Sequence, residues 1–324
     1  MKTIKIGLLG LGNIGTGTYK TLEMNRSEIE STLNAKVEIV KILERDTERD
    51  RGITVPKEKF TSDPDEIFQD PEIDIVIELL GGIEPATTFM LSALKNGKHV
   101  VTANKAALAA NYHELINIAK ENNVILRFEA SVGGGIPILG TLTGPLRANK
   151  FEEVMGILNG TTNYILTMMT KEGLDYETAL KDAQEQGFAE ADPTADVEGI
   201  DAANKLTILM ALMFDKYVAP KDIPTTGITE ITKEKIEEAR SNGCKIKLIA
   251  HAWRDENDEI KYEVRPMYIS ATHPLANINK EFNAVFVKGN AVDDVMFYGK
   301  GAGPLPTGSA VLGDVIDISM MILK

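Results

Sequence analysis

The feature that most constrains the fold is a glycine-rich turn, Gly10-Leu11-Gly12-Asn13-Ile14-Gly15, near the N-terminus. An apolar run at Thr3–Leu9 precedes it and predicts a strand, and a helical pattern at Ile14–Met24 follows it. This context is typical of dinucleotide binding, because Gly10 permits a tight turn, Gly12 lets the backbone approach a pyrophosphate and Gly15 allows close helix–strand packing. The alternative is a glycine-rich turn without a ligand, but the position after a strand favours a cofactor. Candidate cofactor-binding residues are therefore Gly10, Gly12, Asn13, Ile14 and Gly15.

Strands and helices continue to alternate over the first 130 residues. Helical periodicity predicts helices at Ala86–Lys95 and Lys105–Asn122. Such alternation is typical of βαβ units that form a parallel sheet with helices on both faces. We therefore predict a doubly wound Rossmann domain, of the α/β class, over residues 1–130. Short β-branched runs predict its further strands at Val37–Leu43, Ile73–Leu80, His99–Thr102 and Val124–Phe128.

The pattern changes after Ser131, where strands and helices no longer alternate strictly. This indicates a second, α+β domain with an antiparallel sheet over residues 131–303. A long apolar helix over residues 304–324 is expected to pack back on the first domain. Within the second domain the sequence predicts helices at Thr162–Lys171, Tyr176–Gln186 and Ile200–Met213, and strands at Lys245–His251, Tyr262–Ile269, Ala284–Lys288 and Val295–Tyr298.

Composition narrows the possible partners and the compartment. The 324 residues include 48 acidic and 35 basic side chains, a formal net charge of −13 that disfavours nucleic acid and anionic membranes. A small-molecule partner is expected instead. The single cysteine, Cys244, excludes an intrachain disulfide, and the four histidines lack the spacing of metal ligands. With neither a signal-peptide pattern nor an apolar run of membrane-spanning length, the chain is expected to be cytoplasmic.

Ribose recognition is expected where the second predicted strand ends, at Leu43-Glu44-Arg45-Asp46. A carboxylate here would bind the ribose hydroxyls of NAD, whereas Arg45, with Lys57 or Lys59, would pair with the 2′-phosphate of NADP. The alternative is that these charges simply face water. The sequence leaves both cofactors open and slightly favours NADP.

Thr102-Ala103-Asn104-Lys105 lies at the carboxyl end of a predicted strand, where open α/β sheets bind their ligands. A lysine at a helix start is unfavourable beside the positive end of the helix dipole, so Lys105 invites a functional explanation. The simpler explanation is a solvated surface lysine.

A second lysine follows an acidic segment. Residues 188–205 contain several carboxylates, and Asp201 and Lys205, four residues apart, would share one face of a helix. They could form an ordinary surface ion pair, but the apolar run Leu206–Met213 follows directly and predicts a buried helix. Buried charges are costly unless they are paired or used. Carboxylates of this kind suit a substrate ammonium group, and a lysine can exchange the proton on a reducible carbonyl.

With these motifs, the sequence resembles the homoserine dehydrogenase family along nearly its whole length. Its shared segments are the Gly10–Gly15 turn, Thr102–Lys105, Glu129–Pro137, Gly156–Tyr164 and Gly187–Lys205, the last being the most specific. The resemblance implies NAD(P)H-dependent interconversion of L-aspartate 4-semialdehyde and L-homoserine, in threonine, methionine and isoleucine biosynthesis.

The resemblance also assigns residues. Lys105 and Lys205 would be the acid–base lysines, and a Na⁺ or K⁺ ion would be held mainly by backbone oxygens, as a hard cation requires. It further implies a homodimer or larger homo-oligomer formed through the second domain. The implied substrate-binding residues are Glu190, Asp196, Asp201, Asn159, Gly160 and Thr161; the additional cofactor-binding residues are Thr102, Lys105 and Gly303; and the cation site would comprise Glu129, Val132, Gly134 and Ile136.

The chain departs from many relatives in two places. Phe188 stands where many relatives have tyrosine, so a hydrogen bond from that hydroxyl is absent. The sequence ends at Lys324 without their regulatory extension, so no threonine inhibition through such a domain is expected.

Two alternatives remain open at the level of sequence. Another two-domain amino-acid dehydrogenase would share the cofactor fold but act on a different amino aldehyde or imine. A nicotinamide-binding sensor without catalysis would not need Lys105, Asp201 and Lys205 together, and the sequence contains neither a basic arm nor a helix-turn-helix that would support a regulator.

Overall fold

The computed structural model describes residues 2–324. Its internal contacts divide the chain into two compact units, which are described separately. The first, the parallel-sheet unit, contains residues up to Gly135 together with Ala302–Lys324. The second, the antiparallel-sheet unit, contains Ile136–Gly301.

The parallel-sheet unit has six strands in the order β3-β2-β1-β4-β5-β6, with every neighbouring pair parallel. This is the strand order of a Rossmann fold, so the predicted fold class is confirmed. The strands are β1 (Thr3–Leu9), β2 (Lys36–Leu43), β3 (Phe60–Thr61), β4 (Ile75–Glu78), β5 (His99–Thr102) and β6 (Leu126–Arg127). The helices are α1 (Asn13–Met24), α2 (Arg26–Leu33), α3 (Asp65–Phe68), α4 (Ala86–Lys95), α5 (Lys105–Ala110), α6 (Tyr112–Glu121) and α13 (Pro304–Ile322), with short 3-10 turns η1 (Lys57–Lys59) and η2 (Glu129–Ser131).

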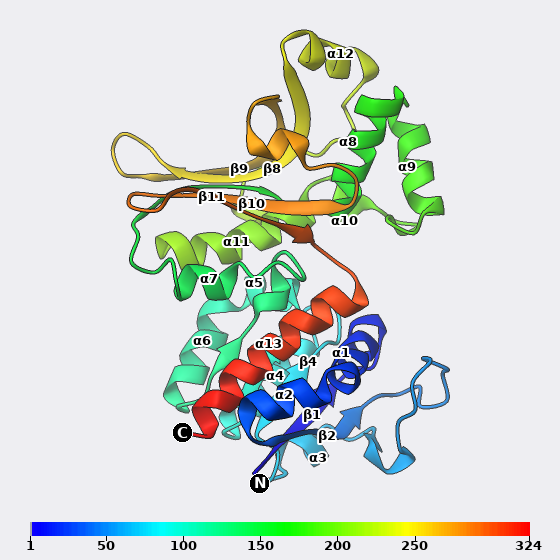
Figure 1. Ribbon diagram of the computed structural model, residues 1–324, viewed down its shortest axis with the longest axis vertical. Helices are drawn as coiled ribbons and strands as arrows, with labels where there is room; N and C mark the ends of the chain where they lie inside the picture. The colour runs from blue at the N-terminus through cyan, green and yellow to red at the C-terminus, as the bar shows by residue number, and fades with distance from the viewer. Residues whose placement is uncertain (1) are drawn as a thin grey trace. The chain divides into compact units, whose positions relative to one another are not determined.

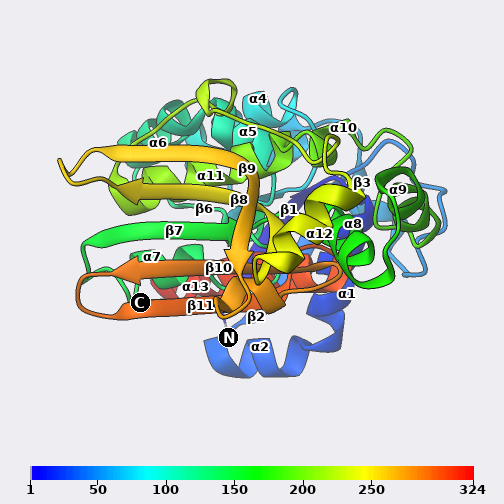
Figure 2. The same ribbon diagram turned by 90° about the horizontal axis from the view of Figure 1, so that it is seen from above.

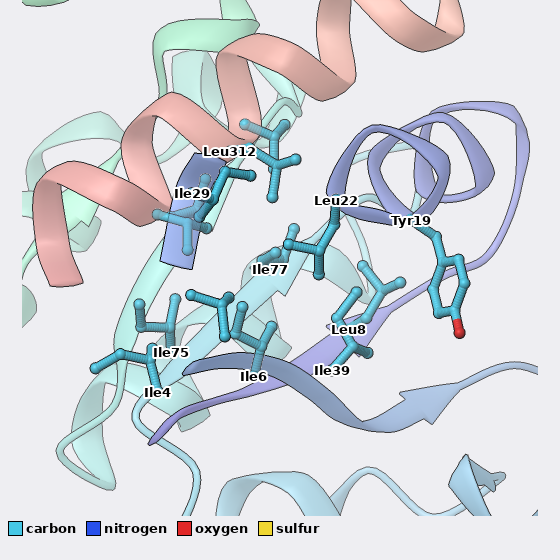
Figure 3. Packing of buried hydrophobic residues seen from close by; sticks show 14 of the residues in the cluster. Ile4, Ile6, Leu8, Tyr19, Leu22, Ile29, Ile39, Ile75, Ile77 and Leu312 are labelled. Atoms are coloured by element: carbon cyan, nitrogen blue, oxygen red, sulfur yellow. The ribbon is translucent and has the colours of Figure 1, made fainter. Parts of the chain in front are cut away.

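Helices cover both faces of this sheet: α1, α2 and α13 lie on one side, and α4 and α6 on the other (Figures 1 and 2). Alternate residues of the central strands, such as Ile6 and Ile77, pack against Leu22 of α1 and Leu312 of α13 (Figure 3). These side chains are almost fully buried. The C-terminal helix α13 thus contributes Val311, Leu312, Val315 and Ile318 to the core of this unit.

Two predictions about helices need correction. The single helix predicted over Lys105–Asn122 is two helices, because Asn111 adopts a non-helical backbone conformation. Its side chain donates hydrogen bonds to the Ala107 carbonyl and the Thr87 hydroxyl instead. Helix α13 is also long and apolar enough to span a membrane by length and composition alone, contrary to the sequence-based expectation. Its buried stripe, including Val311 and Val315, forms part of a protein core instead.

The antiparallel-sheet unit has five strands in the order β11-β10-β7-β8-β9, all antiparallel (Figure 2). Helices α8 and α11 pack against this sheet. A short turn, η4, packs on the sheet through Leu275 and Ala276. The strands are β7 (Phe151–Ile157), β8 (Cys244–Arg254), β9 (Ile260–Ser270), β10 (Phe282–Gly289) and β11 (Asp293–Lys300). The helices and turns are α7 (Leu139–Thr143), α8 (Gly160–Glu172), α9 (Tyr176–Glu185), α10 (Thr194–Val197), α11 (Ile200–Phe214), η3 (Pro220–Asp222), α12 (Lys233–Ser241) and η4 (Pro274–Asn277).

Candidate active site

The glycine-rich turn has the geometry that its sequence predicts. Gly10 has a φ of 91°, a conformation that other residues adopt only with strain. A Cβ on Gly15 would lie 2.2 Å from the Gly10 carbonyl oxygen, so α1 approaches the turn as closely as a glycine allows. Apart from its own neighbours in the chain, no atom of residues 2–324 lies within 4 Å of where a Cβ on Gly12 would stand. The N-terminus of α1 has neither an acidic residue in its first turn nor a side-chain cap, so its amides can bind an anion.

An arginine in the loop after β2, Arg51, lies beside the end of this strand, and sequence reasoning missed it. The Glu44 carboxylate accepts hydrogen bonds from the main-chain N–H groups of Leu11, Arg45 and Asp46, at 3.0, 2.8 and 3.1 Å. It also pairs with Arg51 at 3.2 Å, and Arg51 donates to the Leu11 carbonyl at 2.7 Å. Arg51 therefore joins the ribose end of β2 to the glycine-rich turn. Only spatial proximity reveals this, since the two segments are separated in sequence by forty residues.

Two of the three basic candidates at this edge, Arg45 and Lys57, lie differently. Arg45 is exposed. Lys57 exposes 88% of its side chain and forms an ion pair with Glu48 at 3.5 Å. The structure therefore brings neither side chain onto the glycine-rich turn as it does Arg51.

The Thr102–Lys105 segment forms the turn between β5 and α5. The Asn104 side chain caps α5 by accepting a hydrogen bond from the Ala107 amide at 3.0 Å. The Thr102 hydroxyl is buried and accepts from the Asn104 amide at 2.9 Å. Lys105 is the first residue of α5 and is partly buried.

In the antiparallel-sheet unit, four candidate residues form one network. The Asn159 amide caps α8 through its oxygen, which accepts from Thr162, and its nitrogen donates to Asp196 at 2.6 Å and Asp201 at 3.0 Å. Asp201 forms the ion pair with Lys205 that their spacing predicts, at 2.7 Å, and each side chain is only 10% exposed. Residues 159, 196, 201 and 205 thus come together from the N-cap of α8 and from α10 and α11.

This network concentrates charge away from water. Burial raises the pKa of Asp196, and the nearby carboxylate of Asp201 adds to that rise, whereas the Asn159 hydrogen bond and Lys205 oppose it. Lys205 also donates to the Leu158 carbonyl at 2.5 Å. Such a cluster of two carboxylates and one ammonium group can bind an amino acid and exchange a proton with it.

The remaining substrate-binding candidates lie beside this network or apart from it. A Cβ on Gly160 would lie 2.7 Å from the Glu281 carbonyl oxygen, so the start of α8 packs tightly on the main chain. The Thr161 hydroxyl donates to the Phe188 carbonyl at 2.6 Å, and the Phe188 ring lies 4.7 Å from that of Tyr164. Glu190 is exposed, and its main-chain carbonyl accepts a hydrogen bond from the Gln184 side chain at 3.2 Å.

The loop proposed for a cation starts at the end of the parallel sheet. Gly133 and Gly134 both have positive φ, 75° and 54°. The Glu129 amide donates a hydrogen bond to Asp314 of α13 at 2.8 Å, and burial raises the pKa of Asp314 to about 7. Gly303, with a φ of 117°, precedes α13. Among residues 2–324, no group of three or more histidine, cysteine, aspartate or glutamate side chains is placed to hold a metal.

Comparison with known proteins decides which family combines such a glycine-rich turn with such a network of carboxylates and a lysine. Residues 10–129 match the family model described as homoserine dehydrogenase, NAD binding domain, and residues 137–316 match the homoserine dehydrogenase model. The chain belongs to the homoserine dehydrogenase family. Membership makes the chain an NAD(P)-dependent oxidoreductase with a nicotinamide-binding first domain. The family relationship therefore argues against both alternatives, a sensor without catalysis and a dehydrogenase for another substrate.

Individual homoserine dehydrogenases support this placement. The enzyme of Bacillus subtilis is 45% identical over 318 residues, which cover 98% of this chain and 73% of the relative. The crystal structure of a homoserine dehydrogenase from Thiobacillus denitrificans superposes with a TM-score of 0.95 at 43% identity, covering 99% of this chain and 74% of that one. A hyperthermophilic archaeal homoserine dehydrogenase in complex with NADPH gives a TM-score of 0.82 at 25% identity, covering 98% of each chain.

Proposed function

We propose that this chain interconverts L-aspartate 4-semialdehyde and L-homoserine, as a step in threonine, methionine and isoleucine biosynthesis. The observation that carries the proposal is the buried network of Asn159, Asp196, Asp201 and Lys205. Both compounds have an ammonium group, which suits the carboxylates, and an oxygen that gains or loses a proton during the reaction, which suits the lysine.

In this proposal the lysines exchange the proton and the carboxylates bind the ammonium group of the substrate. When bound, the nicotinamide supplies or accepts the hydride. Lys205, held by Asp201 and the Leu158 carbonyl, donates a proton to the developing alkoxide and stabilises its charge. Lys105, at the start of α5, takes part in the same proton exchange. Asp196 and Asp201 bind the substrate ammonium, with Glu190, Gly160 and Thr161 as further contacts.

NADP is proposed as the preferred cofactor. Binding of NAD through its ribose would use an acidic side chain at the end of β2. The Glu44 carboxylate already accepts three main-chain hydrogen bonds and pairs with Arg51, so its charge is compensated. Exposed Arg45 and Lys57 then remain to meet a 2′-phosphate. Replacing Arg45 by alanine should lower kcat/KM about tenfold or more with NADP and leave the value with NAD unchanged.

A Na⁺ or K⁺ ion is proposed at the loop of Glu129, Val132, Gly134 and Ile136. Gly133 and Gly134 both have positive φ, and the main-chain carbonyls of such a loop are the oxygen ligands that a hard cation prefers. The residues present therefore fit such an ion, which would fix the conformation of this loop.

The functions assigned to the two domains, the oligomeric state and the cellular compartment are also proposals. Residues 131–303 bind substrate and form a homodimer, which the exposed side chains of Tyr268, Met296 and Tyr298 on β9 and β11 support. A cytoplasmic location agrees with the use of a small, charged metabolite.

The experiment that tests the proposal is a spectrophotometric assay. Purified protein is mixed with homoserine and either NAD or NADP, and absorbance is followed at the reduced-nicotinamide band. Growth of the band establishes the reaction and ranks the two cofactors. Silence with both, while fluorescence shows that each cofactor binds, would contradict the proposed substrate.

A further inference from the structure

Glu78 is a buried acid that the proposed reaction does not use. It is the last residue of β4, in the middle of the parallel sheet, and its exposed fraction is 0%. Burial raises the pKa of Glu78, and its hydrogen bonds oppose that rise. Burying an ionisable group costs stability, so the hydrogen bonds that Glu78 accepts need an explanation.

Each oxygen of the Glu78 carboxylate holds a different turn. One accepts from the Leu80 amide at 2.7 Å, in the turn that follows β4. The other accepts from the Thr102 hydroxyl at 2.6 Å, in the turn that follows β5. Both turns lie at the carboxyl edge of the sheet, where a Rossmann fold binds its ligands.

The hydrogen bonds continue from Thr102 to the start of α5. The Thr102 hydroxyl accepts from the Asn104 amide, and the Asn104 side chain caps α5. The same side chain donates to the Gly82 carbonyl at 2.7 Å, which ties the second turn back to the first. Lys105 is the residue that follows Asn104 and opens the helix.

We infer that Glu78 is a positioning residue, which fixes the Thr102–Asn104 turn and thereby the orientation of Lys105. This inference rests on the role proposed for Lys105. A carboxylate suits the task because it offers acceptors on both oxygens and no donor. A glutamine of the same shape could still accept from the Leu80 amide, but its NH₂ group would reverse the bond to Thr102, whose hydroxyl would then have to accept from both position 78 and the Asn104 amide.

The test combines Glu78→Gln with Lys105→Ala in a double-mutant cycle. Glu78→Gln alone should lower kcat about tenfold, the effect of a buried group left without its partner, while the Kd of the reduced cofactor stays within about twofold. In the Lys105→Ala background the same change should lower kcat by less than about twofold, because its effect passes through that lysine. Asp74→Asn is the matched control. Asp74 lies just before β4, at the end of the strand opposite Glu78, and its carboxylate accepts a hydrogen bond from the Lys5 amide. Loss of this carboxylate should leave kcat unchanged.

Asn104→Ala is a second variant, for use if Glu78→Gln does not fold. It removes the cap and the bond to Gly82 from a partly exposed position, and its effect on kcat should also vanish without Lys105. Wild-type kcat in Glu78→Gln, or a full additional loss in the Lys105→Ala background, overturns the inference alone. Near-wild-type turnover of Lys105→Ala overturns the proposed role of that lysine, and the inference with it.

Discussion

The two units of the molecule hold their functional charges by different means. In the parallel-sheet unit, the Glu44 carboxylate accepts hydrogen bonds mainly from main-chain amides of turns. In the antiparallel-sheet unit, Asp201 is held by the side chains of Asn159 and Lys205. A turn tolerates changes that preserve the backbone, whereas a buried side-chain network fails when one partner is lost. The parallel-sheet unit should therefore lose stability or ligand binding when a side chain is added at a glycine of a turn. The antiparallel-sheet unit should lose them when a charged side chain of its network is removed.

The largest effect is expected from Asp201→Ala, which leaves Lys205 buried without its carboxylate. Breaking a buried ion pair from one side destabilises a protein by about 3–5 kcal/mol. Urea unfolding followed by circular dichroism measures the change. The matched control is Glu185→Ala, which breaks the exposed pair of Lys181 and Glu185 on α9 and should cost less than about 1 kcal/mol. Equal losses in the two variants would contradict the importance of burial.

Lys205→Ala should lower turnover by about 10²-fold or more, the usual scale for losing a general acid. Affinity for the reduced cofactor should be retained, because Lys205 belongs to the antiparallel-sheet unit. Steady-state kinetics and a fluorescence titration of the cofactor separate the two quantities. Lys181→Ala, which removes an exposed lysine from the same unit, should leave both unchanged. Near-wild-type turnover of Lys205→Ala would exclude the proposed acid–base role.

Two glycine variants test how the parallel-sheet unit fails. The Cβ of Gly15→Ala would stand 2.2 Å from the Gly10 carbonyl, so both stability and cofactor affinity should fall, by about 1–3 kcal/mol. The Cβ of Gly12→Ala has no other atom of residues 2–324 within 4 Å apart from its chain neighbours, so the melting temperature should stay unchanged. Its methyl group enters the space of the ligand, so the affinity for the cofactor should fall about tenfold. Thermal unfolding with and without cofactor distinguishes them. A Gly12→Ala variant that binds normally would place the pyrophosphate elsewhere.

The last effect is a slope with pH and concerns Lys247, a buried lysine of β8 that donates to the Asn163 side chain at 2.8 Å. Burial lowers the pKa of Lys247 to about 7. Between this value and the ordinary lysine pKa of about 10.4, the unfolded chain binds more protons than the folded chain. The free energy of unfolding should therefore rise with pH in this window, by at most about 1.4 kcal/mol per unit, and the cost of burying the charge is fully present below pH 7.

Urea unfolding at pH 7 and pH 9 measures this slope in the wild type and in Lys247→Met. The methionine variant should lose the contribution that rises with pH. Lys245→Met, two residues away on the same strand, should keep it. An identical slope in all three proteins would mean that Lys247 stays charged in the folded state.

Local patterns were sufficient to predict much of the fold. The strand Thr3–Leu9 and the helix Ala86–Lys95 have the predicted bounds, because their periodicity is set by neighbours in sequence. Strand β7 escaped prediction because Glu152 and Glu153 interrupt its apolar run. Their partners, Lys288 at 3.8 Å and His251 at 2.7 Å, lie far away in sequence on β10 and β8.

The candidate site shows the same limit. Asp201 and Lys205 were paired from their spacing alone, since four residues make one helical turn. Arg51 and Glu78 were missed because their contacts cross the unit: Arg51 reaches Leu11, and Glu78 reaches Thr102. A glutamate inside a predicted strand and an arginine in a charged loop carry no local signal of these contacts. Sequence therefore identified residues whose partners are near in the chain and missed those whose partners are distant.

Helix α13 gives the chain a particular order of assembly on the ribosome. Val311, Leu312, Val315 and Ile318 complete the core that begins at β1, yet they are synthesised after the whole antiparallel-sheet unit. The nascent nucleotide-binding sheet must therefore wait with one face partly uncovered while the inserted unit is made. Any substitution that delays the inserted unit prolongs this exposure, so variants far from the glycine-rich turn can lower the yield of cofactor-binding protein without touching its binding site.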